Sequence, residues 1–232
     1  MPSINPRDSR PLIVFDLDGT LAHTAPDICA SVNGTLAPYG AHKLSVEEVT
    51  GMIGNGLNVL LSRAMEATNI QLDPKETSSL VAQMIERYAE APTQYSTLYP
   101  GVEETLRTLK RNGFELGVCT NKTESIAKSI LDDFNLTPCF SAIIGSLPER
   151  PKKPDPLPLE LVIDACGGDV ANTMLIGDSA ADADTAKALN IPCLIVTFGY
   201  TKIPPGQLGG TQTIDHFHQI PDLAAQLLTF PE

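Results

Sequence analysis

Short, continuous apolar runs alternate with segments of helical periodicity along most of this 232-residue chain. The apolar runs span residues 11–15, 114–119, 142–145, 173–176 and 192–197. Runs of this length are typical of strands that are buried on both faces of a parallel sheet. The helical segments span residues 102–110, 124–134, 157–166 and 180–189. This alternation predicts an α/β fold with helices around a doubly wound, mostly parallel sheet.

Residues 23–94 interrupt the alternation, because they contain no convincing buried strand. Helical patterns instead cover residues 26–37, 46–52, 57–68 and 74–89. Ser45 and Glu48 have the spacing of a capping box, which supports a helix start there. We therefore expect an all-helical cap domain at 23–94, inserted into a core that comprises residues 1–22 and 95–232.

Four polar motifs lie at or near the ends of the predicted strands. In chain order they are Asp16-Leu17-Asp18-Gly19-Thr20, Thr120-Asn121-Lys122, Lys152-Lys153-Pro154, and Gly177-Asp178-Ser179 with Asp182. Sites in open α/β sheets form at the carboxyl ends of the strands, so we expect the motifs to meet at one edge. Together they offer two carboxylates, a hydroxyl, a cation and an acidic pair. These groups suit phosphoryl transfer assisted by a divalent metal.

Asp16 and Asp18 are two residues apart, a spacing that starts both side chains on the same face of a strand. Gly19 then allows the chain to turn sharply. We interpret Asp16 as a nucleophile that attacks phosphorus and Asp18 as the group that transfers the proton. An aspartate that merely caps the next turn would explain the first motif taken alone, but not the ordered set of four.

The second motif and the following lysines can bind phosphate. The Thr120 hydroxyl can donate a hydrogen bond, and Asn121 and Lys122 can offer backbone N–H groups near the start of the next helix. Lys153 can neutralise charge on the transferring group, whereas Lys152 is expected to face solvent. Taken alone, the threonine and asparagine would be better explained as a helix cap, and the two lysines as a solvated basic loop.

The last motif supplies acidic side chains at the start of a predicted helix. Asp178 follows a strand, and Asp182 lies four residues later on the same side of the first helical turn, with Ser179 between them. Carboxylate ligands suit Mg²⁺. An acidic helix N-terminus that complements the helix dipole would explain one aspartate, but it explains Gly177 and the second aspartate less well. Asp184 lies beyond the motif and is expected at the surface.

Composition narrows the choice of partners. A net charge of −12 with 16 Lys and Arg residues argues against nucleic acid. No apolar stretch is long enough to span a membrane, and the first ten residues lack the apolar region of a signal peptide. The five cysteines are scattered, which favours reduced thiols over zinc or disulfides. We expect a cytoplasmic monomer or homodimer that acts on a small phosphorylated metabolite.

The four motifs, in this order and spacing, resemble those of the haloacid dehalogenase superfamily of phosphohydrolases. That resemblance implies a Rossmann-like core with a helical cap inserted between the first two motifs. Within the superfamily, the chain is more similar to bacterial phosphoglycolate phosphatases. The closer similarity lies in Ala25-Pro26-Asp27-Ile28, Ile53-Gly54-Asn55-Gly56, Thr120-Asn121-Lys122 and Thr197-Phe198-Gly199-Tyr200. The chain departs from many relatives in having Ala22-His23-Thr24 where they have Val-Asp-Ser.

The resemblance implies hydrolysis of 2-phosphoglycolate through an aspartyl-phosphate on Asp16. Asp18 would act as general acid and then as general base. Thr120 and Lys153 would bind the phosphoryl group. Mg²⁺ would be held by the Asp16 carboxylate, by Asp178 and by the backbone carbonyl of Asp18. Asp182, Ser179 and Gly19 would be supporting residues.

Residues near the cap are candidates for substrate specificity: Thr24, Asn55, Gly56 and Lys122. The turn around Asn55 could contact a substrate carboxylate, or it could simply be a flexible turn at a helix start. His23 is expected to be structural. Two other functions remain open. One is a phosphosugar mutase, or a sugar-phosphate or pyrophosphate phosphatase, on the same scaffold; the other is a catalytically silent binding module.

Overall fold

Six strands form a parallel sheet in the computed structural model, which describes residues 10–230. In their order across the sheet they are β5 (Ala142–Ser146), β4 (Glu115–Thr123), β1 (Leu12–Phe15), β6 (Thr173–Gly177), β7 (Cys193–Val196) and β8 (Gln212–Ile214). Every neighbouring pair is parallel. The predicted α/β class and the mostly parallel sheet are therefore confirmed.

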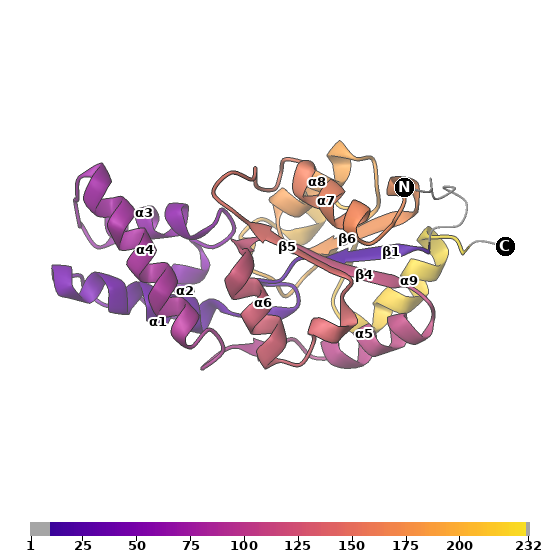
Figure 1. Cartoon of the computed structure of the whole chain (residues 1–232), viewed down its shortest axis with the longest axis horizontal. Helices are drawn as coiled ribbons and strands as arrows, with labels where there is room; N and C mark the ends of the chain where they lie inside the picture. Colours follow the sequence, from indigo (N-terminus) through magenta and orange to yellow (C-terminus); the bar gives the residue numbers. More distant parts are fainter. Residues whose placement is uncertain (1–9, 231–232) are drawn as a thin grey trace.

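Helices cover both faces of this sheet (Figure 1). One face carries α7 (Leu157–Ala165) and α8 (Ala180–Ala188), and the other carries α5 (Val102–Arg111), α6 (Glu124–Asp133) and α9 (Ile220–Leu227). Short 3₁₀ turns occur at Ala37–Tyr39, Thr137–Cys139, Val170–Asn172, Pro205–Gln207 and Phe217–Gln219.

The central strand shows why its sequence is continuously apolar. Leu12 and Val14 pack into the cluster on the α7 and α8 face, whereas Ile13 and Phe15 pack into the cluster on the opposite face. All four side chains are fully buried. Alternate residues of a strand point to opposite faces, so a sheet covered on both sides requires an apolar residue at every position.

The strand order reverses at β1. The chain steps from β1 to β4 and β5 on one side, and then from β6 to β7 and β8 on the other. The carboxyl ends of β1, β4 and β6 therefore lie together at a topological switch point. This is where open α/β sheets form their ligand sites.

Four helices form the second part of the molecule, shown in purple at one end of Figure 1. They are α1 (Ala25–Leu36), α2 (Val46–Thr50), α3 (Leu57–Ala67) and α4 (Pro74–Glu90). The expected helices occur within two residues of their predicted bounds, and the Ser45–Glu48 capping box is formed. Two short strands that the sequence did not indicate, β2 (Ala22–His23) and β3 (Thr97–Leu98), pair antiparallel where the chain leaves and re-enters the core.

The sequence patterns also did not predict β8 (Gln212–Ile214) or α9 (Ile220–Leu227). β8 is an edge strand in which Gln212 and Thr213 are exposed and only Ile214 is buried. A strand with one buried residue carries no apolar run.

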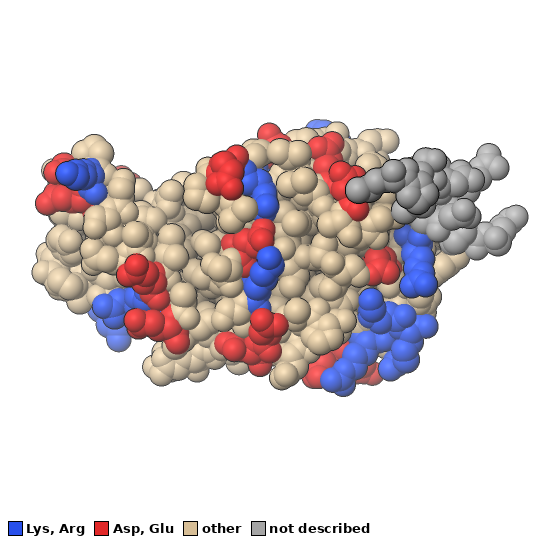
Figure 2. All heavy atoms as spheres, in the orientation of Figure 1, with Lys and Arg blue, Asp and Glu red and all other residues tan. Residues whose placement is uncertain are grey.

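Acidic and basic side chains are interspersed in small groups over the face drawn in Figure 2. Within residues 10–230, no helix combines the length and the apolar character needed to cross a bilayer.

Candidate active site

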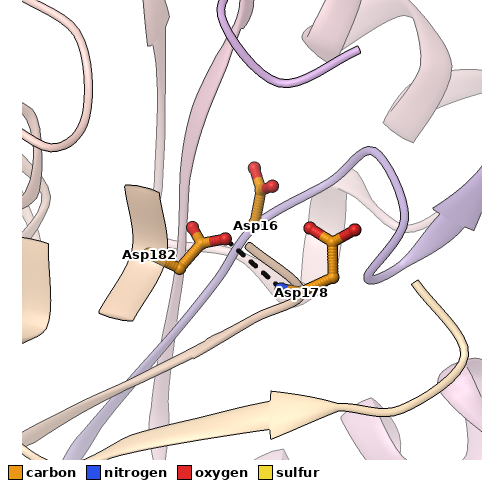
Figure 3. A group of neighbouring side chains, drawn as sticks. All are labelled: Asp16, Asp178 and Asp182. Carbon is orange, nitrogen blue, oxygen red and sulfur yellow. Dashed lines mark hydrogen bonds between the residues drawn. The ribbon is translucent and has the colours of Figure 1, made fainter. Parts of the chain in front are cut away.

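Three buried carboxylates converge at the switch point of the sheet. Asp16 directly follows β1, Asp178 directly follows β6, and Asp182 lies in the first turn of α8. Figure 3 shows Asp16 between the other two side chains. Each aspartate offers an oxygen within 4.8 Å of the others. The first and last motifs, which are far apart in sequence, thus form one acidic cluster.

Glycines allow the backbone to close around this cluster. Gly19 has a φ of +82°, a conformation that other residues rarely adopt, and a Cβ there would overlap the Asp178 carboxylate. A Cβ at Gly199 would overlap the same side chain, and one at Gly177 would overlap Asp182. The supporting role predicted for Gly19 is therefore steric as well as conformational.

Ser179 and Asp182 form the N-terminal cap of α8. The Ser179 hydroxyl donates to Asp182 Oδ2 at 2.6 Å, and the backbone N–H groups of Ser179 and Asp178 donate to the same oxygen at 3.1 and 3.3 Å. Asp182 Oδ1 accepts from the Lys153 ammonium at 2.6 Å. Both Asp182 oxygens thus accept hydrogen bonds from the protein, so this aspartate fixes the positions of Lys153 and of the Asp178–Ser179 backbone.

Lys153 lies against the acidic cluster. Its Nζ donates to the carbonyl of Cys119 at 2.7 Å and lies 3.0 Å from Asp16 Oδ1. Burial by itself lowers the pKa of this ammonium, but the adjacent Asp16 and Asp182 carboxylates raise it above its usual range. Lys153 is therefore a permanent cation. Lys152, expected to face solvent, is only partly exposed and places its Nζ 3.5 Å from the Asn55 carbonyl in the cap.

The second motif forms the last part of β4, directly before α6, so Asn121 and Lys122 lie near a helix start as predicted. β4 continues through an irregularity between Cys119 and Thr123, and α6 begins only at Glu124. Thr120 is buried and accepts from the Lys122 N–H at 3.3 Å. β4 therefore extends beyond the apolar run that ends at Cys119. The buried polar side chains of Thr120, Asn121 and Lys122 are tolerated there because each has a hydrogen-bond partner within the protein.

Asn121 connects three segments through its side-chain amide. Its Oδ1 accepts from the Lys153 N–H at 2.8 Å, and its Nδ2 lies 3.0 Å from the carbonyls of Lys153 and Gly54. The amide therefore holds the lysine loop in place and connects it to the cap. The side-chain amide is thus structural, and phosphate binding by the backbone N–H of Asn121 stays a prediction.

Asp18 lies at the boundary between core and cap. Its carboxylate accepts from the Thr24 hydroxyl at 2.5 Å and from Lys122 Nζ at 2.9 and 3.1 Å. The Lys122 ammonium also donates to the hydroxyl of Tyr88, a buried residue of α4, at 2.7 Å. Thr24 and Lys122, both proposed for specificity, thus contact the second aspartate of the first motif.

Tyr200 is a site residue that the sequence analysis did not assign. Its backbone N–H donates to Asp178 Oδ2 at 2.6 Å. Its hydroxyl accepts from the N–H groups of Thr24 and Ala25 at 2.7 and 3.0 Å and lies 3.2 Å from His23 Nδ1. Tyr200 therefore connects the acidic cluster to the strand that leads into the cap. The segment Thr197–Tyr200 was noted only for its family resemblance.

Two carboxylates of the cluster, Asp16 and Asp178, resist ionisation. Burial raises the pKa of Asp16 to about 6, with Lys153 opposing the shift and Asp182 and Asp18 adding to it. Burial and the neighbouring Asp182 and Asp16 raise the pKa of Asp178 well above its usual range. Asp16 Oδ1 is buried and, among the described residues, accepts no hydrogen bond, although the Lys153 ammonium lies 3.0 Å away. A bound cation would relieve both conditions, and hard carboxylate oxygens suit Mg²⁺, so the residues fit this metal.

A cavity of about 330 Å³ connects the cluster to the cap. Core residues of all four motifs line it, together with apolar cap residues such as Ile28, Ile53 and Leu60. Asn55 and Gly56 also line it, although the exposed Asn55 side chain accepts a hydrogen bond from Arg63 at 3.2 Å. A cavity of this size can hold a small metabolite.

Comparison with known proteins agrees with this geometry. The family model described as haloacid dehalogenase-like hydrolase matches residues 13–196. A phosphoglycolate phosphatase from Cereibacter sphaeroides is 40% identical over 220 residues, which cover 94% of this chain and 99% of the relative. A phosphoglycolate phosphatase from Caulobacter vibrioides is 38% identical over 217 residues, with coverage of 94% and 92%.

A solved structure shows the same similarity in three dimensions. It is the crystal structure of a predicted phosphoglycolate phosphatase from Haemophilus somnus, which superposes with a TM-score of 0.85 at 33% identity. The match covers 92% of this chain and 97% of the other.

Proposed function

Because this chain belongs to the haloacid dehalogenase-like hydrolase family and is a phosphatase, we propose that it hydrolyses 2-phosphoglycolate to glycolate and phosphate. One observation carries the chemistry: Asp16 is buried between two carboxylates and a lysine, and it lines a cavity of metabolite size. The names of the similar proteins support the choice of substrate.

The same cluster supports a magnesium-dependent reaction. Asp16, Asp178 and the backbone carbonyl of Asp18 would hold the ion, and Asp182 and Ser179 would orient them through the hydrogen bonds described above. When bound, Mg²⁺ offsets the negative charge that otherwise keeps a carboxylate and a phosphate apart.

The side chains then divide the reaction into two steps. In the first, an Asp16 oxygen forms a bond to phosphorus as the bond from phosphorus to the ester oxygen breaks. Asp18 donates a proton to that leaving oxygen, which releases glycolate. In the second, a water molecule attacks the aspartyl-phosphate while Asp18 accepts its proton, which regenerates Asp16. Thr120 and Lys153 bind the phosphoryl oxygens throughout.

The cap gives this chemistry a closed environment. We place its bounds at residues 23–94, which include α1 to α4 and the cap side of the cavity. A cavity lined by both parts allows a small substrate to be shielded from bulk water while it reacts.

The test is phosphate release from a panel of substrates, with Mg²⁺ and with excess EDTA. The panel contains 2-phosphoglycolate, several sugar phosphates, pyrophosphate and an aryl phosphate. We expect magnesium-dependent release with the highest kcat/KM for 2-phosphoglycolate. A higher value for another ester would reject the substrate and retain the chemistry. Phosphosugar interconversion that requires a bisphosphate would indicate a mutase, and no turnover would indicate a binding module.

A further inference from the structure

Two buried lysines line the cavity, and each contacts a different aspartate of the first motif. We call the surroundings of each lysine one end of the site. Lys153 contacts Asp16, Asp182 and the Cys119 carbonyl, so it belongs to the end that takes the phosphoryl group. The side chain of Lys122 is only 1% exposed and lies beside Asp18. It therefore belongs to the end where the leaving group departs.

The cap holds Lys122 in this position. The Tyr88 hydroxyl accepts a hydrogen bond from its Nζ, and the same ammonium lies 4.5 Å from the centre of the Tyr88 ring. Burial raises the pKa of the Tyr88 hydroxyl, so it stays neutral and acts as an acceptor. A buried ammonium is costly unless it is paired, so a cap residue that helps to pair it points to a use for the charge.

The position of Lys122 relative to Asp18 suggests that use. Asp18 donates its proton to the ester oxygen of the substrate, and the carboxylate of 2-phosphoglycolate is separated from that oxygen by one carbon. Lys122 Nζ contacts both Asp18 oxygens, at 2.9 and 3.1 Å, so it is within reach of a group attached next to the leaving oxygen. A substrate carboxylate could replace one of these two contacts, and the other would keep Lys122 in place.

We infer that Lys122, held by Tyr88 of the cap, binds the substrate carboxylate and selects phosphate esters of small α-hydroxy acids. This inference rests on the proposed function, because it assumes that the substrate carries a carboxylate beside the ester oxygen. The exposed Lys202 also lines the cavity, but water screens its charge and it lies outside the buried network.

A preference ratio tests the inference. It is kcat/KM for 2-phosphoglycolate divided by kcat/KM for ethyl phosphate, which has a methyl group in place of the carboxylate. We expect Lys122→Met to lower this ratio about 10- to 150-fold, the range for one hydrogen bond between charged groups. Tyr88→Phe keeps the ring and removes only the hydroxyl, and it should lower the ratio about 3- to 10-fold, the range for one ordinary hydrogen bond.

Lys202→Met is the matched control, because it removes a charge from the same cavity, and it should change the ratio less than about 3-fold. A second readout is inhibition by glycolate, whose inhibition constant should rise in Lys122→Met. Circular dichroism would show whether each variant is folded. If Lys122→Met does not fold, Tyr88→Phe carries the test.

Different results would reject the proposed substrate and the proposed role of Lys122. A wild-type enzyme with no preference for 2-phosphoglycolate over ethyl phosphate would reject the proposed substrate. A wild-type preference that persists in Lys122→Met and Tyr88→Phe would overturn the role of Lys122 alone. An equal loss for both esters would also overturn it, because it would show that Lys122 acts only by positioning Asp18.

Discussion

The two ends of the site are built differently. The Lys153 end is made within the core, where strand ends and the start of α8 bring carboxylates and a cation together. The Lys122 end is shared, because Tyr88 from α4 and Thr24 at the cap entrance contact the same network. In the proposed reaction this difference separates chemistry from recognition: the core end holds the phosphoryl group, and the shared end contacts the leaving group and the cap.

The largest expected effect is loss of the nucleophile at the core end. Asp16→Asn should lower kcat by about 10⁴-fold or more, because an amide cannot form the covalent intermediate. The variant should still fold, since the Asp16 carboxylate resists ionisation in its buried position. Steady-state kinetics and thermal unfolding would be measured together. Near-normal turnover would show that Asp16 is not the nucleophile.

The next largest effect is expected at the third motif, where substitutions of Lys153 and Lys152 can be compared. Lys153→Ala should lower kcat/KM about 10³-fold and destabilise the protein by about 3–5 kcal/mol, because it leaves buried carboxylates unpaired. Lys152→Ala, whose Nζ makes one long contact with the Asn55 carbonyl, should lower kcat/KM less than about 10-fold. Denaturant unfolding and kinetics of both variants are needed, and the opposite order would assign the phosphoryl contact to Lys152.

Metal binding should depend on pH at the core end. Because the pKa of Asp16 is raised to about 6, the folded protein keeps a proton there at pH values where the unfolded chain has lost it. This group therefore favours folding most at low pH, and that contribution is lost as the pH rises toward 6.

Mg²⁺ binds ionised carboxylates, so the Asp16 proton should lower its affinity as the pH drops below about 6, by at most tenfold per pH unit. The raised pKa of Asp178 should add to this loss. Titration calorimetry of Mg²⁺ from pH 5 to 8 would measure this dependence. Asp16→Asn serves as the control, because it should remove that proton's contribution. A flat profile in the wild type would contradict the expectation.

The smallest effect tests the connection between the acidic cluster and the cap. Tyr200→Phe removes the hydroxyl that accepts from the backbone of Thr24 and Ala25. Leaving these N–H groups without an acceptor should cost about 1–3 kcal/mol of stability. The backbone bond from Tyr200 to Asp178 stays, so kcat should change less than about 10-fold. Unfolding curves unchanged from wild type would show that the hydroxyl contacts are not maintained in solution.

Local patterns were enough to predict the sheet and the acidic motifs. An apolar residue at every position of β1 requires burial on both faces, and a turn glycine after paired aspartates marks the end of such a strand. Residues 10–230 accordingly show the predicted strands and helices, although β2, β3, β8 and α9 were not predicted. These features depend on neighbours along the chain, and a sequence records them directly.

Three-dimensional packing alone determined which polar groups face one another. Asn121 contacts Lys153 across 32 positions, Lys122 contacts Asp18 across 104, and Tyr200 contacts Thr24 across 176. No periodicity encodes such pairs, because each side chain becomes a partner only after the sheet and the cap have packed together. The sequence thus determined the chemical groups of this phosphatase, and the tertiary structure decided which of them contact Asp16, Asp18 and the cap.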